Sequence, residues 1–343
     1  MFSIIALTIL GLVFALYDSY LTVWVTISHL DLISLFIIII IGIIPFLGWA
    51  LILMIFGRTI DKKFTYRNGV INAYVGGFMS GITPSSTGGQ IAQIYAYKKA
   101  GIKTSQGAGL ISMDFFLYQI GYVILSIVLY IVYLSTYTGF AITIIFALSL
   151  LLNSFVVVVM WVMVKFPKLY HRLSYCAIQL LYKAKFIKNK EKILDTWNST
   201  LVQFNKSIDS ISTNKKVFWQ ALLLNIARLT FYFSSPFLIA LLLNIPVSAN
   251  DFLPMIALAG FVSLANTFVP IPGSSGATES LFVIVISTIL GKSHAASIMI
   301  LWRFTNFYVP VIFGGWLFLR IKNIKISNKM STADLISEPK NGS

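Results

Sequence analysis

The chain has 343 residues, of which 57% are hydrophobic and only 11% are charged. Soluble globular proteins carry about 25% charged residues, so this composition excludes a soluble domain and indicates a polytopic membrane protein. The formal net charge of +15 does not indicate nucleic-acid binding, because the Lys and Arg residues lie in short loops between apolar runs, where the positive-inside rule places them.

The first apolar runs predict two membrane spans that are joined on the outer side. Residues Phe2 to Tyr17 have no basic leader and no small-residue cleavage site, so they indicate a retained span and not a signal peptide. Residues Leu32 to Phe56 are long enough to cross the bilayer with some tilt, and Pro45 predicts a kink. The connection has no Lys or Arg and is expected outside, which places the N-terminus in the cytoplasm.

A polar sequence then interrupts an apolar run at membrane depth. It reads TPSSTGGQ over residues 83–90, between the short runs Gly69 to Ile82 and Ile91 to Tyr97. Proline and glycine break the helix there, and lipid cannot satisfy the freed backbone groups, so the break needs a protein-lined or watery cavity. Because basic loops flank both sides, residues 69–97 are predicted to be a re-entrant hairpin with its tip at residues 84–89.

Two further spans, Gln106 to Leu134 and Ala141 to Val164, lead to the one sizeable polar region. This region, Lys165 to Lys216, has eleven Lys or Arg residues against three acids and is predicted to be cytoplasmic. Within it, apolar residues recur at three- and four-residue steps from Ile193 to Ile211, which predicts an amphipathic helix. The pattern covers scarcely three heptads, which favours a helix on the inner leaflet over a coiled coil.

The second half repeats this plan. Val217 to Leu243 predicts an outward span, and a second interrupted segment follows, with Pro272 placed 188 residues after Pro84 (272 − 84). It reads PIPGSSGATE over residues 270–279, between the apolar runs 252–269 and 281–290. Ala295 to Leu319 then returns to a basic end.

These elements predict an all-α polytopic membrane protein with six full spans and two re-entrant helical hairpins, one from each side, as an inverted repeat would produce. A single integral membrane domain is expected over residues 1–320. It divides into a first half (1–164), a cytoplasmic loop with the amphipathic helix (165–216) and a second half (217–320). Residues 321–343 are expected to be a polar cytoplasmic tail.

Four ionisable residues fall inside apolar segments: Asp114, Arg228, Glu279 and Arg303. A charged residue at a helix centre costs about 2.5 to 3.5 kcal/mol on insertion scales, so these residues are expected to face a cavity or to pair with one another. Helical spacing places further polar residues on the same faces, namely Asn225 and Tyr232 with Arg228, Asn306 with Arg303, Tyr118 and Tyr122 with Asp114, and Gln90 with Gln93.

Two interpretations of these residues stay open. In the first, the arginines pair with Glu279 or Asp114 only to hold the structure together. In the second, Arg228 and Arg303 bind an anionic head group, because guanidinium forks match phosphate geometry, and Glu279 and Asp114 are their partners or proton carriers. Half-helix N-termini after Gly89 and Gly276 would add backbone donors. The hydroxyl groups at both breaks would either bind the head group or only form turns.

The predicted head-group-binding residues come from both breaks and from the polar faces of the spans. They are Ser85, Ser86, Thr87, Gly88, Gly89, Gln90, Gln93, Asp114, Asn225, Arg228, Tyr232, Ser274, Ser275, Gly276, Glu279, Arg303 and Asn306.

The sequence contains no competing catalytic or metal-binding motif. There is no phosphate-loop GxxxxGK[ST], no HExxH and no GxSxG, and the single Cys176 excludes an internal disulfide and a cysteine cluster for metal. No catalytic residue, cofactor or metal is therefore expected. Movement of a substrate without a nucleotide site would depend on a gradient, on downstream consumption, or on no driving force at all.

The two interrupted segments resemble a known family. The run from Gly81 to Tyr95, with Lys98 to Ile102 after it, is similar to the membrane domain of the lysylphosphatidylglycerol synthase/flippase family of the multiple peptide resistance type. The second signature, Ile271 to Glu279, and the later Leu301-Trp302-Arg303 resemble that family too, and the similarity spans nearly the whole chain. It implies a multi-pass protein of the bacterial inner membrane, often dimeric, that handles phospholipid or glycolipid head groups.

Full-length members of that type carry a cytosolic aminoacyltransferase domain after the membrane domain. It transfers lysine from its tRNA to phosphatidylglycerol and so confers resistance to cationic peptides. The chain is expected to lack this domain, because only a short polar tail follows residue 320. The predicted function is therefore a lipid translocase of the flippase or scramblase kind that handles an anionic or aminoacylated phospholipid or glycolipid head group. A phosphatidylglycerol lysyltransferase and a membrane partner of a separate synthase are the alternatives.

Overall fold

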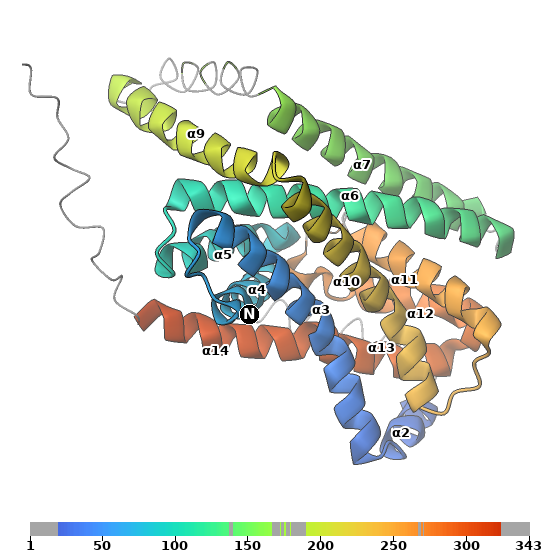
Figure 1. Ribbon diagram of the computed structural model, residues 1–343. Coiled ribbons are helices and arrows are strands. Elements are labelled where there is room, and N and C mark those ends of the chain that lie inside the picture. Colours follow the sequence, from blue (N-terminus) through green and yellow to red (C-terminus); the bar gives the residue numbers. More distant parts are fainter. Residues whose placement is uncertain are drawn as a thin grey trace, which may run out of the picture.

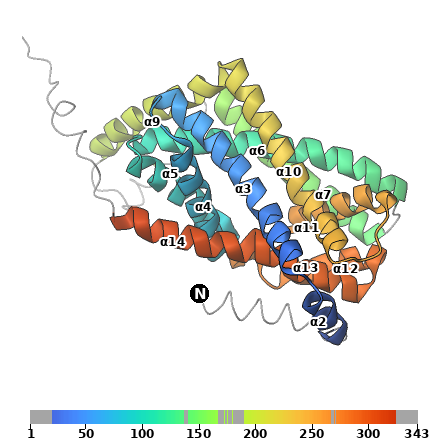
Figure 2. The ribbon, with the colours of Figure 1, turned by 60° about the horizontal axis from the view of Figure 1, so that its bottom comes forward.

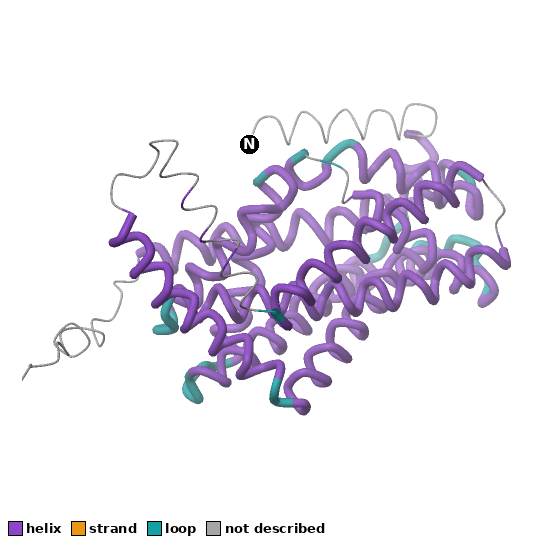
Figure 3. The backbone as a smooth tube through the Cα atoms, turned by 90° about the horizontal axis from the view of Figure 1, so that it is seen from above, coloured by secondary structure: helices purple, strands orange, loops and turns teal. Residues whose placement is uncertain are grey.

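Helices make up the regular structure of the protein. The computed structural model describes residues 20–136, 140–166, 172, 175, 179, 190–266, 269 and 271–323, and no strand occurs among them (Figure 3). The predicted first span, residues 2–17, and the tail from residue 324 onward lie outside the described residues. Residues 321–323, which we expected in the polar tail, still belong to the last helix.

The helices follow one another with short connections (Figure 1). Their bounds are α2 (Tyr20–Ser28), α3 (Leu32–Ile60), α4 (Tyr66–Ile82), η1 (Pro84–Ser86), α5 (Thr87–Lys99), α6 (Thr104–Thr136), α7 (Phe140–Lys165), α9 (Lys190–Ser212), α10 (Lys215–Leu242), η2 (Ala249–Asp251), α11 (Phe252–Ala265), η4 (Pro272–Ser274), α12 (Ala277–Leu290), α13 (Lys292–Arg303), the π-helical η5 (Phe304–Tyr308) and α14 (Val309–Asn323). Side chains cap several starts: Asp31 accepts bonds from two backbone N–H groups of α3, and Asn214 accepts one from α10.

The architecture confirms an all-α polytopic membrane protein. Five described segments are long and apolar enough to cross a membrane: Leu32–Ile60, Thr104–Val132, Lys215–Leu242, Pro272–Leu290 and Lys292–Lys322. Four of them correspond to predicted spans, and Pro45 lies inside α3 without ending it. The predicted span Ala141 to Val164 lies in α7, whose described apolar part, Phe146–Val162, is shorter than the five. The remaining one of the five, Pro272–Leu290, belongs to the second predicted re-entrant hairpin. By length and composition it could also cross the membrane completely.

Two helical hairpins approach each other from opposite ends of the molecule. Helices α4 and α5 form the first and pack along each other, with η1 at the tip; α11 and α12 form the second, with η4 at the tip. The first pair lies toward one end of the molecule and the second toward the other (Figures 1 and 2). The two tips, η1 and η4, contact each other. Both predicted breaks therefore interrupt helices, and they meet.

The two tips share a local backbone plan. Each starts with a proline at the first position of a 3-10 turn, Pro84 or Pro272, where its missing N–H costs no helical bond. Each turn then holds a serine in the left-handed region, Ser86 with φ 57° and Ser274 with φ 49°. Non-glycine residues in that region cost of order 1–3 kcal/mol and cluster at functional sites.

Close helix contacts hold the first hairpin together and fix it to the last helix. A Cβ on Gly89 of α5 would lie 1.9 Å from the hydroxyl oxygen of Ser80 on α4, so only glycine permits this approach. On the other side of α4, a Cβ on Gly314 of α14 would lie 2.1 Å from the carbonyl oxygen of Tyr74. Small residues let helices approach in this way when lipid provides no hydrophobic driving force between them.

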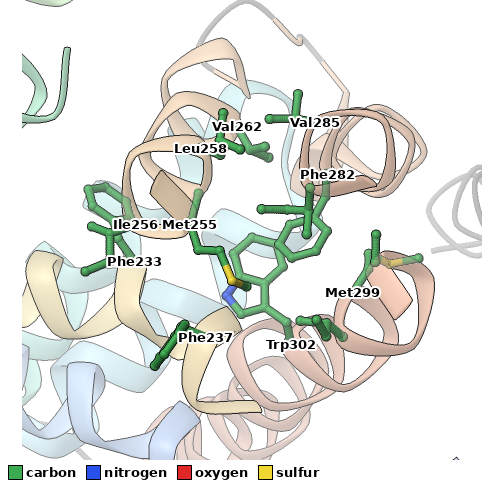
Figure 4. Packing of buried hydrophobic residues seen from close by; sticks show 14 of the residues in the cluster. Phe233, Phe237, Met255, Ile256, Leu258, Val262, Phe282, Val285, Met299 and Trp302 are labelled. Carbon is green, nitrogen blue, oxygen red and sulfur yellow. The ribbon is translucent and has the colours of Figure 1, made fainter. Parts of the chain in front are cut away.

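The largest apolar core surrounds the second hairpin (Figure 4). It joins side chains of α6, α7, α10, α11, α12 and α13, and Trp302 is 1% exposed at its centre. The indole of Trp302 stacks on Phe282 of α12 with ring centroids 4.9 Å apart. Because Trp302 points into this core, the next residue of α13, Arg303, is directed elsewhere.

The predicted amphipathic helix exists, and its apolar face packs against other helices of the protein. It is α9, and its apolar residues Leu201, Ile208 and Ile211 are buried against α6 and its neighbours. The serine hydroxyl of Ser210 also meets Thr59 at the end of α3, with 3.1 Å between the oxygens. This apolar face therefore has a protein partner, and the position on the inner leaflet stays a prediction.

Candidate functional site

A polar cavity lies where the two hairpin tips meet. Its volume is about 390 Å³, and residues of α3, α4, α6, α10, α11, α12, α13 and η5 complete the wall around the two tips. Its polar lining consists of Ser80, Ser86, Tyr118, Tyr122, Arg228, Tyr232, Ser263, Asn266, Ser274, Thr278, Arg303 and Asn306. Small-molecule sites in proteins have volumes of about 300–1,000 Å³, so the cavity has the size of a ligand site.

A second cavity adjoins the first. It measures about 640 Å³ and lies between α5 and α6, with Gln90, Gln93 and Asp114 on its wall. The two cavities share five lining residues, Trp49, Ser80, Ser86, Tyr118 and Arg228. Arg228 therefore stands at the boundary, within reach of a group in either space.

Arg303 is tied to the second tip. Its Nε donates to Glu279 Oε1 at 2.8 Å, and its Nη2 donates to the carbonyl oxygen of Gly273 at 3.0 Å. Glu279 accepts a further bond from the Gly276 backbone N–H at 2.7 Å through Oε2. The ring of Phe307 lies 4.2 Å below the guanidinium. The buried pair therefore fixes the turn to α13, as the first interpretation of these residues predicts for structural ion pairs.

Arg228 has a different environment. Its Nε donates to Asn225 Oδ1 at 2.9 Å, and the Asn225 amide donates in turn to the Ala221 carbonyl oxygen at 3.0 Å. The aromatic rings of Trp49 and Tyr118 lie 5.2 and 5.0 Å from the guanidinium carbon, which supplies cation–π contacts. Within the part of the chain that the structure describes, neither Nη group of Arg228 meets a hydrogen-bond acceptor. The guanidinium is thus held through Nε and by the two aromatic rings, and its terminal Nη donors are left for a ligand.

Asp114 lies beside Arg228 without pairing to it. Its Oδ2 accepts a bond from the indole Nε1 of Trp49 at 2.8 Å, whereas its Oδ1 is buried with no partner among the described residues. Asp114 is 4% exposed. A buried polar atom without a partner costs about 1–3 kcal/mol, so this oxygen indicates a place where a ligand or water belongs.

Comparison with known proteins agrees with this membrane-embedded arrangement. The family model described as "Lysylphosphatidylglycerol synthase TM region" matches residues 2–314. The chain belongs to the lysylphosphatidylglycerol synthase TM-region family. A relative described as a UPF0104 membrane protein, from Archaeoglobus fulgidus, is 23% identical over 317 residues, which cover 91% of this chain and 93% of the relative. The resemblance that the two interrupted segments carry is thereby confirmed.

In this member of the TM-region family, most of the predicted site residues line one or both cavities. They are Ser86, Thr87, Gln90, Gln93, Asp114, Arg228, Tyr232, Ser274, Arg303 and Asn306. Asn225, Ser275, Gly276 and Glu279 lie behind the wall and position the arginines or the second turn. Gly88 and Gly89 are buried where α5 packs against the end of α4. The side chain of Ser85 lies outside the described part of the structure.

Sequence reasoning missed Trp49, Ser80 and Phe307. Trp49 lies in an apolar run, where no polar neighbour marks its face, although a tryptophan inside a span needs an acceptor for its N–H. Ser80 precedes the first break by one helical turn and was hidden among small residues. Phe307 lies beside the second tip and the end of α4: its ring is 2.5 Å from where a Cβ of Gly273 would stand and 3.3 Å from where a Cβ of Gly81 would stand.

Loss of the hydrogen bond from Trp49 to Asp114 should destabilise the protein. Trp49→Phe keeps an aromatic ring but removes the only described hydrogen bond to Asp114, so we expect the free energy of unfolding to fall by about 1–3 kcal/mol. Chemical denaturation of the purified protein in detergent measures this. Trp219→Phe is the matched control, since Trp219 is 56% exposed. Equal effects of the two changes would contradict the role assigned to the indole N–H.

Proposed function

We propose that this TM-region family protein is a lipid translocase that passes an anionic head group through the two adjoining cavities while the acyl chains stay in the bilayer. The observation that carries the proposal is Arg228. Its guanidinium is half-buried and is held through Nε and by the rings of Trp49 and Tyr118, while its Nη donors meet no acceptor among the described residues. A phosphate oxygen pair matches that donor geometry.

The two arginines take different parts in this proposal. Arg228 binds the phosphate directly. Arg303 keeps the second turn in shape through Glu279 and Gly273, and contributes positive potential to the cavity that it lines. Asn306 and Tyr232 complete the polar wall on that side. This division combines the two interpretations of the sequence, one for each arginine.

The basic helix ends support an orientation. The ends of α3, α5 and α14 carry Arg58, Lys98 and Lys99, and Arg320 and Lys322. The Lys99 ammonium approaches the Lys322 carbonyl oxygen at 3.5 Å, so the ends of α5 and α14 lie together. By the positive-inside rule this end faces the cytoplasm, the first hairpin is re-entrant from that side, and the second hairpin is re-entrant from the other. Cytoplasmic termini and a bacterial inner-membrane location belong to the same proposal, as does rocking of the two halves for access.

A second candidate is favoured by the family description, which names a synthase. In that case the protein would make lysylphosphatidylglycerol from phosphatidylglycerol and charged tRNA, or would serve as the membrane partner of a separate synthase. Assembly into a homodimer is compatible with either role. Formation of lysyl-lipid by the purified chain with lysyl-tRNA would favour the enzyme over the translocase.

The translocase is tested by reconstitution. The purified protein is placed in vesicles that contain phosphatidylglycerol with a fluorescent acyl chain, and a membrane-impermeant reductant bleaches label in the outer leaflet. We expect the protected fraction to fall well below the half that protein-free vesicles retain. A protected fraction equal to that of protein-free vesicles would reject the proposal.

A further inference from the structure

The second cavity contains two buried polar atoms that no described residue satisfies. One is Asp114 Oδ1, and the other is the amide nitrogen Nε2 of Gln93. The two side chains are 4% and 3% exposed, and both line this cavity. Asp114 comes from α6 and Gln93 from α5, so the cavity has an unpaired acceptor on one wall and an unpaired donor on the other.

Both side chains are held in place. Trp49 fixes Asp114 through Oδ2, which leaves Oδ1 as the unused oxygen. Gln93 packs against Gly76 of α4: its Cγ and Cδ lie 2.6 and 2.8 Å from where a Cβ of Gly76 would stand. A larger residue at position 76 would displace the amide, so the fold makes room for Gln93 in this place. The unpaired atoms therefore belong to a built site and not to mobile side chains.

The chemistry of these atoms distinguishes classes of ligand. A hydroxyl group both donates and accepts, so two neighbouring hydroxyls satisfy an acceptor and a donor together, whether the acid is ionised or protonated. An ammonium group only donates, and would leave Gln93 Nε2 unpaired. Apart from Arg228 and the indole of Trp49, the remaining polar lining of this cavity is also hydroxyl and amide: Ser80, Ser86, Thr87, Gln90 and Tyr118. Among the described residues that line it, Asp114 is the one acid.

We propose that the second cavity binds the hydroxyl groups of a polyhydroxylated head group whose phosphate is held by Arg228. Arg228 lines this cavity as well as the first, so the phosphate and the hydroxyls of one molecule occupy neighbouring positions. The shared chemistry is a vicinal diol, which either a glycerol or a cyclic polyol provides. The inference rests on the proposed translocase and specifies its substrate.

Four acyl-labelled lipids test it in the vesicle assay. Phosphatidylglycerol and phosphatidylinositol carry hydroxyls, phosphatidic acid carries phosphate alone, and phosphatidylethanolamine carries an ammonium. Movement of at least one of the first two should be about tenfold faster than movement of the other two, as expected for one additional satisfied hydrogen-bond pair. The faster of the first two identifies whether the diol is that of glycerol or of a ring.

Variants then assign the preference to the cavity. Gln93→Leu should slow the preferred lipid about tenfold more than it slows phosphatidic acid, since the hydroxyl contact that is lost belongs to the preferred lipid alone. Gln119→Leu is the matched control: this buried glutamine on α6 donates to Asn153 and lines neither cavity, so the preference should persist.

The outcomes separate this inference from the function on which it rests. If the unmodified protein moves all four lipids at one rate, or prefers phosphatidylethanolamine, the diol site is overturned and the translocase stands. The same holds if Gln93→Leu slows phosphatidic acid as much as the preferred lipid. If none of the four moves faster than in protein-free vesicles, both are overturned. The comparison among lipids needs no variant, so poor folding of Gln93→Leu would not prevent the decision.

Discussion

Arg228→Ala is expected to slow lipid movement in reconstituted vesicles about 100-fold, because removal of one partner of a buried charged contact costs about 2–5 kcal/mol and each 1.4 kcal/mol is a factor of ten. The guanidinium is held by Asn225 and by two rings, and its terminal donors have no acceptor in the described chain. Loss of the side chain therefore removes the phosphate contact while breaking a single protein hydrogen bond, so the protein should still fold.

Two further arginine changes sharpen this test. Arg228→Lys keeps the charge but loses the planar fork, and should give an intermediate rate. Arg320→Ala is the matched control, because this exposed arginine also stacks on a tryptophan, Trp316, at 3.9 Å but lies at the end of α14 away from both cavities. Gel filtration and thermal unfolding report the fold of each variant. An Arg228→Ala protein that is folded and as fast as the unmodified one would remove Arg228 from the proposed mechanism.

Glu279→Ala should lower the free energy of unfolding by about 3–5 kcal/mol, the largest stability effect that we expect, because it leaves a buried arginine without its partner. Glu279 is 1% exposed and holds both Arg303 and the Gly276 backbone N–H. Arg303→Ala should cost a similar amount. The double replacement should cost much less than the sum, since neither charge is then left unpaired.

Asp251→Ala is the matched control for this cycle. Asp251 also caps a turn, accepting from the Ser248 backbone N–H at 2.8 Å, but it has no described ion-pair partner. Its loss should cost about 1 kcal/mol, the usual contribution of a cap. Chemical denaturation in detergent gives all four values. Strictly additive effects of Glu279→Ala and Arg303→Ala would show that the pair is not the clamp that the contacts indicate.

Local chemistry made the helix breaks predictable. Proline and glycine act on the backbone where they stand, so the turns at Pro84 and Pro272 could be placed from sequence, and charge in the flanking loops indicated which ends lie together. The amphipathic period of α9 was equally local. The packing partner of α9 could not be predicted, because an apolar stripe suits a membrane leaflet as well as another helix. Its contact with α6 became visible only in the folded structure.

The division of roles between the arginines was beyond the sequence. Glu279 and Arg303 lie 24 residues apart on different helices. In the sequence, Asp114 is as plausible an ion-pair partner for Arg228 as Glu279 is for Arg303. Whether a pair forms depends on ångström-scale distances that spacing along a helix does not contain. Trp49 shows the same limit: it takes the oxygen of Asp114 that an arginine was expected to occupy, across 65 residues of chain.

The two turns that meet at the cavity have similar backbones, but different side-chain hydrogen bonds hold them in place. Side-chain bonds of the first are short-range: Thr83 accepts from the Gly88 N–H and donates to Met79, and Thr87 donates to Pro84. The second turn is also bonded to another helix, because Arg303 of α13 donates to Glu279 and to the Gly273 carbonyl oxygen. The first turn rests on bonds within its own hairpin, so we expect it to shift more readily than the second turn if the cavity opens.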